Sequence, residues 1–323
     1  MPIYQYFNLA VDPICKKGRA NNSAVKTVIN VELKGVRRAQ GKAVIVDPER
    51  ASVTLYHHPE APYYDFSRFT LVDQNVTGKP PAPGLTYKAP PGKRLVEIVD
   101  SEVVFACCGE TNGLWAPNSV IVADGEVIKR EAPGIHAKEK YPLEGKFPFF
   151  VFDEKKRGLN YLLFAAGELK EPLVFSNGIY GPVLIRDCLE VLSPTEEAYP
   201  PIKPNQVPWA YPKIAAIAAV GLDIRGDFIF LAMAGDPKEA LECSPKDITD
   251  ILMQLQTREA ILLGLSADVQ QYIKYPNGQK SWLVGKPRPG SSMETAFPQG
   301  RPISNAILVK DKTTADTGRD IRF

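Results

Sequence analysis

The most regular pattern of apolar and polar segments lies in the C-terminal half of the chain. Apolar runs at residues 215–222 and 228–234 flank the short polar segment 223–227, and this pattern predicts two buried strands joined by a tight turn. A third apolar run at residues 258–265 predicts another strand of the same sheet. The polar segment 266–271 follows where such a sheet would open to solvent, a place where binding sites tend to form.

The segment between the second and third runs predicts an amphipathic helix. Ser244 is a favourable N-cap, and Pro245 follows at a position where a missing N–H costs nothing. Asp247 completes a pattern that resembles a capping box, at the positive end of the helix dipole. Apolar side chains then recur with helical spacing, at Ile248, Ile251, Leu252 and Leu255. We therefore expect one face of this helix to pack on the sheet.

Further short apolar runs predict strands along the rest of the chain. They lie at residues 27–33, 43–46, 52–56, 103–107, 119–122, 149–152, 161–164 and 183–185. Asp124 and Gly125 separate two such runs and tolerate the positive φ of a type I′ turn, which predicts a hairpin. The charged residues 153–157 predict a solvated hairpin loop. The expected fold class is α+β, with a mixed, mainly antiparallel sheet and a few packed helices.

Proline clusters divide the chain. Of the 29 prolines, 15 gather at residues 78–92, 193–212 and 285–302, which predicts long ordered loops. With 323 residues and 44% hydrophobic content, the chain can bury a substantial core. We expect residues 1–94 to form a β-rich extension, residues 95–310 the main domain and residues 311–323 a tail.

Charge and cysteine usage exclude several classes of partner. The net charge of +2 gives no reason to expect a nucleic-acid partner. No apolar run is long enough to span a membrane, and residues 1–20 lack a signal-like apolar stretch, so a cytoplasmic protein is expected. The five cysteines show neither a disulfide framework nor a zinc spacing. We expect reduced thiols, no metal and no cofactor.

Several segments together resemble the phosphodiester glycosidase family. They occur in the family's order and spacing, at residues 175–186, 219–223, 230–235, 247–255 and 301–309. The resemblance covers residues 95–310 and is stronger after residue 170. It implies a phosphodiester glycosidase-like fold and a site for a sugar phosphodiester or related phosphorylated ligand.

The family's catalytic loop is altered in this chain. The family has Asn-Leu-Asp-Gly-Gly-x-Ser, whereas residues 262–268 place Leu262 at the Asn and Gly264 at the Asp. Asp268 and Glu110 are the candidate acid/base residues that could take over. Further candidates for ligand binding, implied by the resembling segments and this loop, are Arg301, Gln270, Ser266, Asn305 and Asn177. Arg301 suits phosphate best, because a planar guanidinium pairs with two phosphate oxygens.

Each candidate also has a structural interpretation. Asp268, Gln270 and Gln271 would lie on a solvent-facing strand edge, Glu110 in a polar turn, and Arg301 in a structural salt bridge or on the surface. The neighbouring Cys107 and Cys108 are expected to be buried, unreactive thiols. The adjacent histidines 57 and 58 are expected to point to opposite faces of a strand, which does not suit a shared metal site.

Three functions follow from these observations. The first is a protein that binds a sugar phosphate or nucleotide on a phosphodiester glycosidase-like fold with a degenerate catalytic loop. The second is a divergent hydrolase of glycosyl phosphodiesters. The third is a structural or assembly protein, for which a homo-oligomer is possible.

Overall fold

The structure is a computed structural model of the chain. It describes residues 10–12, 23–33, 39–58, 69–70, 86–87, 93–99, 102–109, 120–129, 145–165, 168–191, 216–235, 243–265, 269–286, 299–300 and 302–312. These residues form three larger sheets, a two-stranded pair and two helices.

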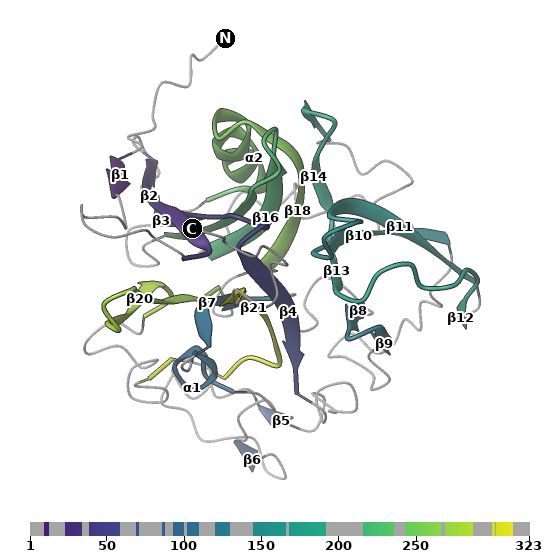
Figure 1. Ribbon diagram of the computed structural model, residues 1–323, viewed down its shortest axis with the longest axis horizontal. Coiled ribbons are helices and arrows are strands. Elements are labelled where there is room, and N and C mark those ends of the chain that lie inside the picture. The colour runs from purple at the N-terminus through teal and green to yellow at the C-terminus, as the bar shows by residue number, and fades with distance from the viewer. Residues whose placement is uncertain are drawn as a thin grey trace, which may run out of the picture.

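The largest sheet has eight strands, and a five-stranded sheet packs on one of its faces (Figure 1). In order across the sheet, the eight strands are β1 (Ala10–Asp12), β2 (Val25–Leu33), β3 (Ala39–Val46), β17 (Phe228–Gly235), β16 (Ala216–Asp223), β18 (Thr257–Leu265), β14 (Val183–Arg186) and β15 (Leu189–Glu190). The five are β20 (Lys280–Val284), β19 (Gln271–Lys274), β7 (Val103–Cys108), β21 (Asn305–Asp311) and β4 (Ala51–His57).

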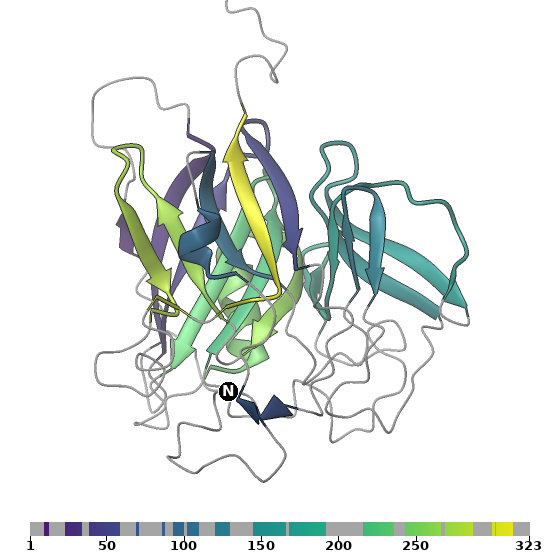
Figure 2. The same ribbon diagram turned by 90° about the horizontal axis from the view of Figure 1, so that it is seen from below.

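A six-stranded sheet stands beside β4 and β21 (Figure 2). Its strands, in order, are β12 (Glu168–Leu169), β11 (Gly158–Ala165), β10 (Gly145–Val151), β13 (Gly178–Tyr180), β8 (Val120–Ala123) and β9 (Glu126–Lys129). Apolar side chains from all three sheets meet in one core, among them Phe230, Ile307 and Ile179. Burial of this shared surface holds the sheets together.

The helix α2 (Pro245–Gln254) covers the other face of the eight-stranded sheet (Figure 1). The expected cap is confirmed: the Ser244 hydroxyl accepts a hydrogen bond from the backbone N–H of Asp247, and the Asp247 carboxylate accepts one from the backbone N–H of Ser244. Ile248, Ile251 and Leu252 are fully buried, as the helical spacing predicted. The short helix α1 (Leu95–Ile98) lies on the outer side of the five-stranded sheet.

Strand pairing is antiparallel throughout the three larger sheets, and the short pair β5 (Phe69–Thr70) and β6 (Thr86–Tyr87) is parallel. The mainly antiparallel architecture is therefore confirmed. The α+β label fits it only loosely, because α1 and α2 are the only helices among the described residues. No helix in this part of the chain is both long and apolar enough to cross a membrane.

Strands from both sides of residue 94 share the same sheets. β2 and β3 pair with each other, β3 pairs with β17, and β4 pairs with β21 near the C-terminus. The division of the chain at residue 94 stays a prediction, as does the tail after residue 310.

Short turns close one end of the sheets. The β16–β17 turn is held by Asp223, whose Oδ1 accepts hydrogen bonds from the backbone N–H groups of Arg225 and Asp227, at 2.8 Å each. The predicted hairpin between β8 and β9 is also confirmed, with φ of 50° at Asp124 and 80° at Gly125. We call the end of the sheets that carries these short turns the turn end.

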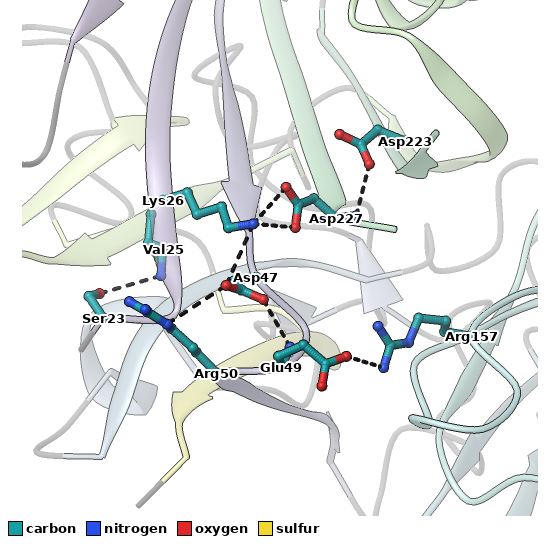
Figure 3. A network of polar contacts seen from close by, with 9 residues as sticks. All are labelled: Ser23, Val25, Lys26, Asp47, Glu49, Arg50, Arg157, Asp223 and Asp227. Carbon is teal, nitrogen blue, oxygen red and sulfur yellow. Dashed lines mark hydrogen bonds and ion pairs between the residues drawn. The ribbon is translucent and has the colours of Figure 1, made fainter. Parts of the chain in front are cut away.

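Ion pairs connect the three sheets at the turn end (Figure 3). Lys26 on β2 pairs with Asp227 at 2.7 Å and with Asp47 at 3.5 Å. Glu49, in the turn before β4, pairs with Arg157 of the β10–β11 hairpin at 3.0 Å. Partial burial of Lys26 would by itself lower its pKa, but the two carboxylates outweigh that effect and raise the pKa. The charged side chains of this network therefore pair with one another.

Candidate functional site

The opposite end of the five-stranded sheet gathers several long chain connections. The strands β4, β7 and β20 end there, and β19 and β21 begin there, as their antiparallel registers require. We call this the site end and define it by residues 57–58, 108–109, 269–271, 284–286, 299–300 and 302–305. Binding residues concentrate on long connections that a rigid sheet positions. The site end therefore suits a ligand better than the ion-paired turn end.

Gln270 is packed into the site end. Its backbone oxygen accepts a hydrogen bond from the N–H of Cys108 at 2.9 Å, and only 1% of the residue is exposed. A Cβ placed on Gly300 would lie 3.0 Å from Gln270 Oε1 and 2.5 Å from the ring of Trp282. The expectation that Gln270 lies on a solvent-facing edge is therefore wrong. Tertiary packing encloses Gln270, although local alternation is typical of a surface strand.

Asn305 also belongs to the site end, on the inward face of the sheet. It is the first residue of β21 and pairs across the strands with His57. A Cβ on Gly109 would lie 2.0 Å from Asn305 Oδ1, so this amide occupies the space that the glycine leaves. Asn305 Nδ2 donates to the hydroxyl of Ser304 at 3.3 Å. The structure therefore brings Gln270 and Asn305, which are far apart in sequence, to one end of one sheet.

Asn177 is held by different contacts. Its N–H donates to Asp153 Oδ1 at 2.9 Å, and its backbone oxygen accepts from Phe152 N–H at 3.0 Å. Both partners belong to the loop of the β10–β11 hairpin, and Arg157 of that loop is part of the turn-end network. The described contacts of Asn177 thus do not involve Gln270 or Asn305.

The remaining candidates, Asp268, Glu110, Ser266 and Arg301, lie outside the described residues. Their roles stay predictions. Two glycines that precede these candidates lie against site-end side chains. A Cβ on Gly109, before Glu110, would meet Asn305, and a Cβ on Gly300, before Arg301, would meet Gln270.

Leu262, which replaces the family's asparagine, lies away from the site end. Its side chain is buried among the α2-facing residues, in the cluster that contains Ile217 and Ile248. The five-stranded sheet packs on the other face, where Leu263 joins the main core. An asparagine at position 262 would therefore enter the apolar layer under α2. Its replacement by leucine does not remove a polar group from the site end.

Gln271 and His57 are further site-end residues, in addition to the candidates Gln270 and Asn305. Gln271 is 1% exposed, and its Nε2 donates to the backbone oxygen of Phe230 at 3.0 Å. His57 is half-buried on the inward face. The polar alternation of residues 268–271 was a weak signal for Gln271. No local signal identified His57, because its neighbours on β21 are some 250 residues away in sequence.

The thiols at the end of β7 are shielded from solvent. Cys107 and Cys108 are both buried, and burial raises the pKa of the Cys107 thiol well above its ordinary value. A thiol in such surroundings stays protonated and is a poor nucleophile. Within the described ranges, no group of three or more His, Cys, Asp or Glu side chains could hold a metal ion.

Comparisons with known proteins give a similarity of fold. No family model matches the sequence, and no curated protein matches it. The catalytic domain of zebrafish N-acetylglucosamine-1-phosphodiester alpha-N-acetylglucosaminidase, described as auto-inhibited by its pro-peptide, matches with a TM-score of 0.53 and 16% identity, over 94% of this chain and 88% of that chain. A hypothetical protein from Synechocystis matches with a TM-score of 0.45 and 14% identity, over 97% of this chain and 69% of that chain, which is too weak to argue from. The chain therefore has a fold similar to that of a glycosyl phosphodiesterase catalytic domain.

Proposed function

We propose that this protein binds a phosphorylated small molecule, a sugar phosphate or a nucleotide, at the site end. The observation that carries the proposal is the chemistry of that end: the amide side chains of Gln270 and Asn305, the imidazole of His57, and no carboxylate among its described residues. An imidazole can provide an N–H donor, and a ligand that carries negative charge meets no described like charge there.

The fold similarity supports the choice of ligand class. The zebrafish protein is named for a phosphodiester of N-acetylglucosamine, and its fold is similar to the fold of this chain over most of both lengths. A fold does not by itself specify a function, so the choice of a phosphorylated ligand is part of the proposal. Arg301 would add a bidentate contact to the phosphate.

Hydrolysis of a glycosyl phosphodiester is the second candidate function. The fold similarity favours it, because the matching zebrafish domain is a catalytic one. The position of Leu262 under α2 also removes one argument against catalysis. In this case Glu110 and Asp268 would supply the acid and the base.

A melting experiment with sugar phosphates and nucleotides tests the first proposal. At a ligand concentration of 100 times Kd, binding raises the free energy of unfolding by about 2.7 kcal/mol, which a shift in Tm resolves. Arg301→Ala should weaken binding roughly ten- to a hundredfold, because it removes a charged hydrogen-bonding partner. Lys155→Ala is the matched control, since Lys155 is an exposed cation in the loop near the turn end.

Turnover measured on the same samples separates the candidates. Sugar release from glycosyl phosphodiesters that is abolished by Glu110→Gln or Asp268→Asn would establish the hydrolase. Stabilisation without turnover supports the binding protein. If the panel shows no stabilisation and no turnover, both candidate functions are rejected and an assembly role is left.

A further inference from the structure

The inference concerns the side chain of His57, the last residue of β4. His57 lies directly opposite Asn305 in the antiparallel register of β4 and β21. The next residue, His58, donates its N–H to the backbone oxygen of Ser304 at 2.7 Å. The His57–Asn305 pair is consequently the non-hydrogen-bonded type, in which opposing side chains lie closest.

Both side chains face inward. Side chains alternate along a strand, and Leu55 and Ile307, two residues deeper on the same strands, are members of the main core. Asn305 Oδ1 fills the space above Gly109. The imidazole and this amide therefore form a polar pair at the mouth of an otherwise apolar layer.

One nitrogen of the His57 imidazole makes no hydrogen bond to the described residues. His57 Nδ1 is shielded from solvent and has no hydrogen-bond partner within the described part of the chain. Buried polar atoms are nearly always paired, and leaving one unpaired destabilises the fold. The ring as a whole is only half-buried, so a ligand can reach its exposed edge and pair with Nδ1 once the ring turns outward.

The neighbouring cation, Lys93, lies on the other face of the sheet. Lys93 Nζ lies 5.9 Å from the ring centroid of Tyr56, and the adjacent Tyr56 and His57 point to opposite faces. On the inward face of the site end, the ring nitrogens of His57 can supply an N–H donor.

We propose that the imidazole of His57 hydrogen-bonds the phosphate group of the ligand, beside the amide of Asn305. This proposal rests on the proposed function and names a residue that holds the phosphate. A phosphate oxygen would satisfy the ring nitrogen that the fold leaves without a partner. Gly109 is required there because any larger residue would displace the Asn305 amide.

Titration calorimetry with glucose 1-phosphate tests the proposal. His57→Ala should lower the affinity roughly ten- to a hundredfold, the usual effect of losing a hydrogen bond to a charged group. His57→Asn, whose amide nitrogen lies near the position of Nδ1, should retain part of it. Gln279→Ala, in the exposed turn at the other end of β19 and β20, is the matched control and should bind as the unmodified chain does. Glucose, which lacks the phosphate, should bind equally to His57→Ala and the unmodified chain.

Nuclear magnetic resonance provides a readout that a structural role would not move. The chain has three histidines, so their ring ¹⁵N signals are readily assigned. Inorganic phosphate should shift the ring nitrogens of His57 and leave those of His58 in place. Melting curves of His57→Ala and His57→Asn show whether each variant folds.

Two results would overturn the inference while the proposed function stands. One is unchanged affinity of His57→Ala for glucose 1-phosphate, with the unmodified chain binding it. The other is an equal loss of affinity for glucose and glucose 1-phosphate, which would make His57 a contact to the sugar. Failure of the unmodified chain to bind any phosphorylated compound in the panel would instead reject the proposed function, and this inference with it.

Discussion

The side-chain amide of Gln271 donates a hydrogen bond to the backbone oxygen of Phe230, with 3.0 Å between Nε2 and O. Gln271 begins β19 of the five-stranded sheet, and Phe230 lies within β17 of the eight-stranded sheet. This bond links the two sheets, and such a bond specifies their relative position more sharply than apolar contact alone.

Gln271→Ala should therefore lower the free energy of unfolding by about 2 to 4 kcal/mol, because it removes the bond and leaves a cavity in a buried site. Urea denaturation measures this loss. Gln279→Ala, in the exposed turn between β19 and β20, is the matched control and should change stability by less than about 0.5 kcal/mol. Equal losses in both variants would contradict the structural role of Gln271.

The buried face of α2 gives a second prediction. Ile251 is fully buried, so Ile251→Ala should cost about 2 to 5 kcal/mol of stability. Met253 is 39% exposed on the same helix, and Met253→Ala should cost less than about 1 kcal/mol. A loss below about 1 kcal/mol for Ile251→Ala would mean that this face is not packed on the sheet.

The third prediction tests the coupling between Gly109 and Asn305. A Cβ at position 109 would lie 2.0 Å from Asn305 Oδ1, so Gly109→Ala must displace that amide. Gly109→Ala should cost about 1 to 3 kcal/mol in the natural background and less when combined with Asn305→Ala. Denaturant melts of both single variants and the double variant measure the coupling. Additive losses would show that the two positions do not touch.

The fourth prediction concerns pH. Burial, followed by the negative charge of Glu97, raises the pKa of Tyr56 from 10.0 to about 12. The folded state holds this proton more tightly than the unfolded chain does, so the resulting stability is complete below pH 10 and is lost as the pH rises toward 12. The stability of Tyr56→Phe should fall less steeply over this range.

Thermal melts of Tyr56→Phe and the unmodified chain between pH 9 and 12 check this expectation. At pH 7 the two should differ by less than about 1 kcal/mol, because Tyr56 Oη is buried without a hydrogen-bond partner among the described residues. Parallel curves across the whole pH range would contradict the assignment to Tyr56.

Local structure followed from the sequence wherever neighbouring residues make the decisive contacts. Ser244 and Asp247 cap α2 through bonds that span three residues. Asp223 closes the β16–β17 turn through backbone groups two and four residues away. Asp124 and Gly125 adopt positive φ for reasons internal to the turn. Such short-range interactions are complete within one segment, so its residues alone predict them.

The site end could not be predicted in the same way. His57 meets Asn305 because β4 and β21 pair in one register, and a shift of one residue would turn both side chains to the other face. That register is set by packing of the main core. Gln270 illustrates the same limit: its polar segment is typical of an exposed edge, yet Trp282 and Gly300 enclose it.

By itself, the sequence determined many of the strands, the capped helix α2 and several turns, since these depend on hydrophobic period and short-range hydrogen bonds. It also indicated a fold similar to the phosphodiester glycosidases, which the structural comparison supports. Only the tertiary structure decided which polar residues meet at the site end and that Leu262 faces α2. The physical reason is that strand register and sheet packing depend on contacts between residues far apart in the chain, which no local pattern records.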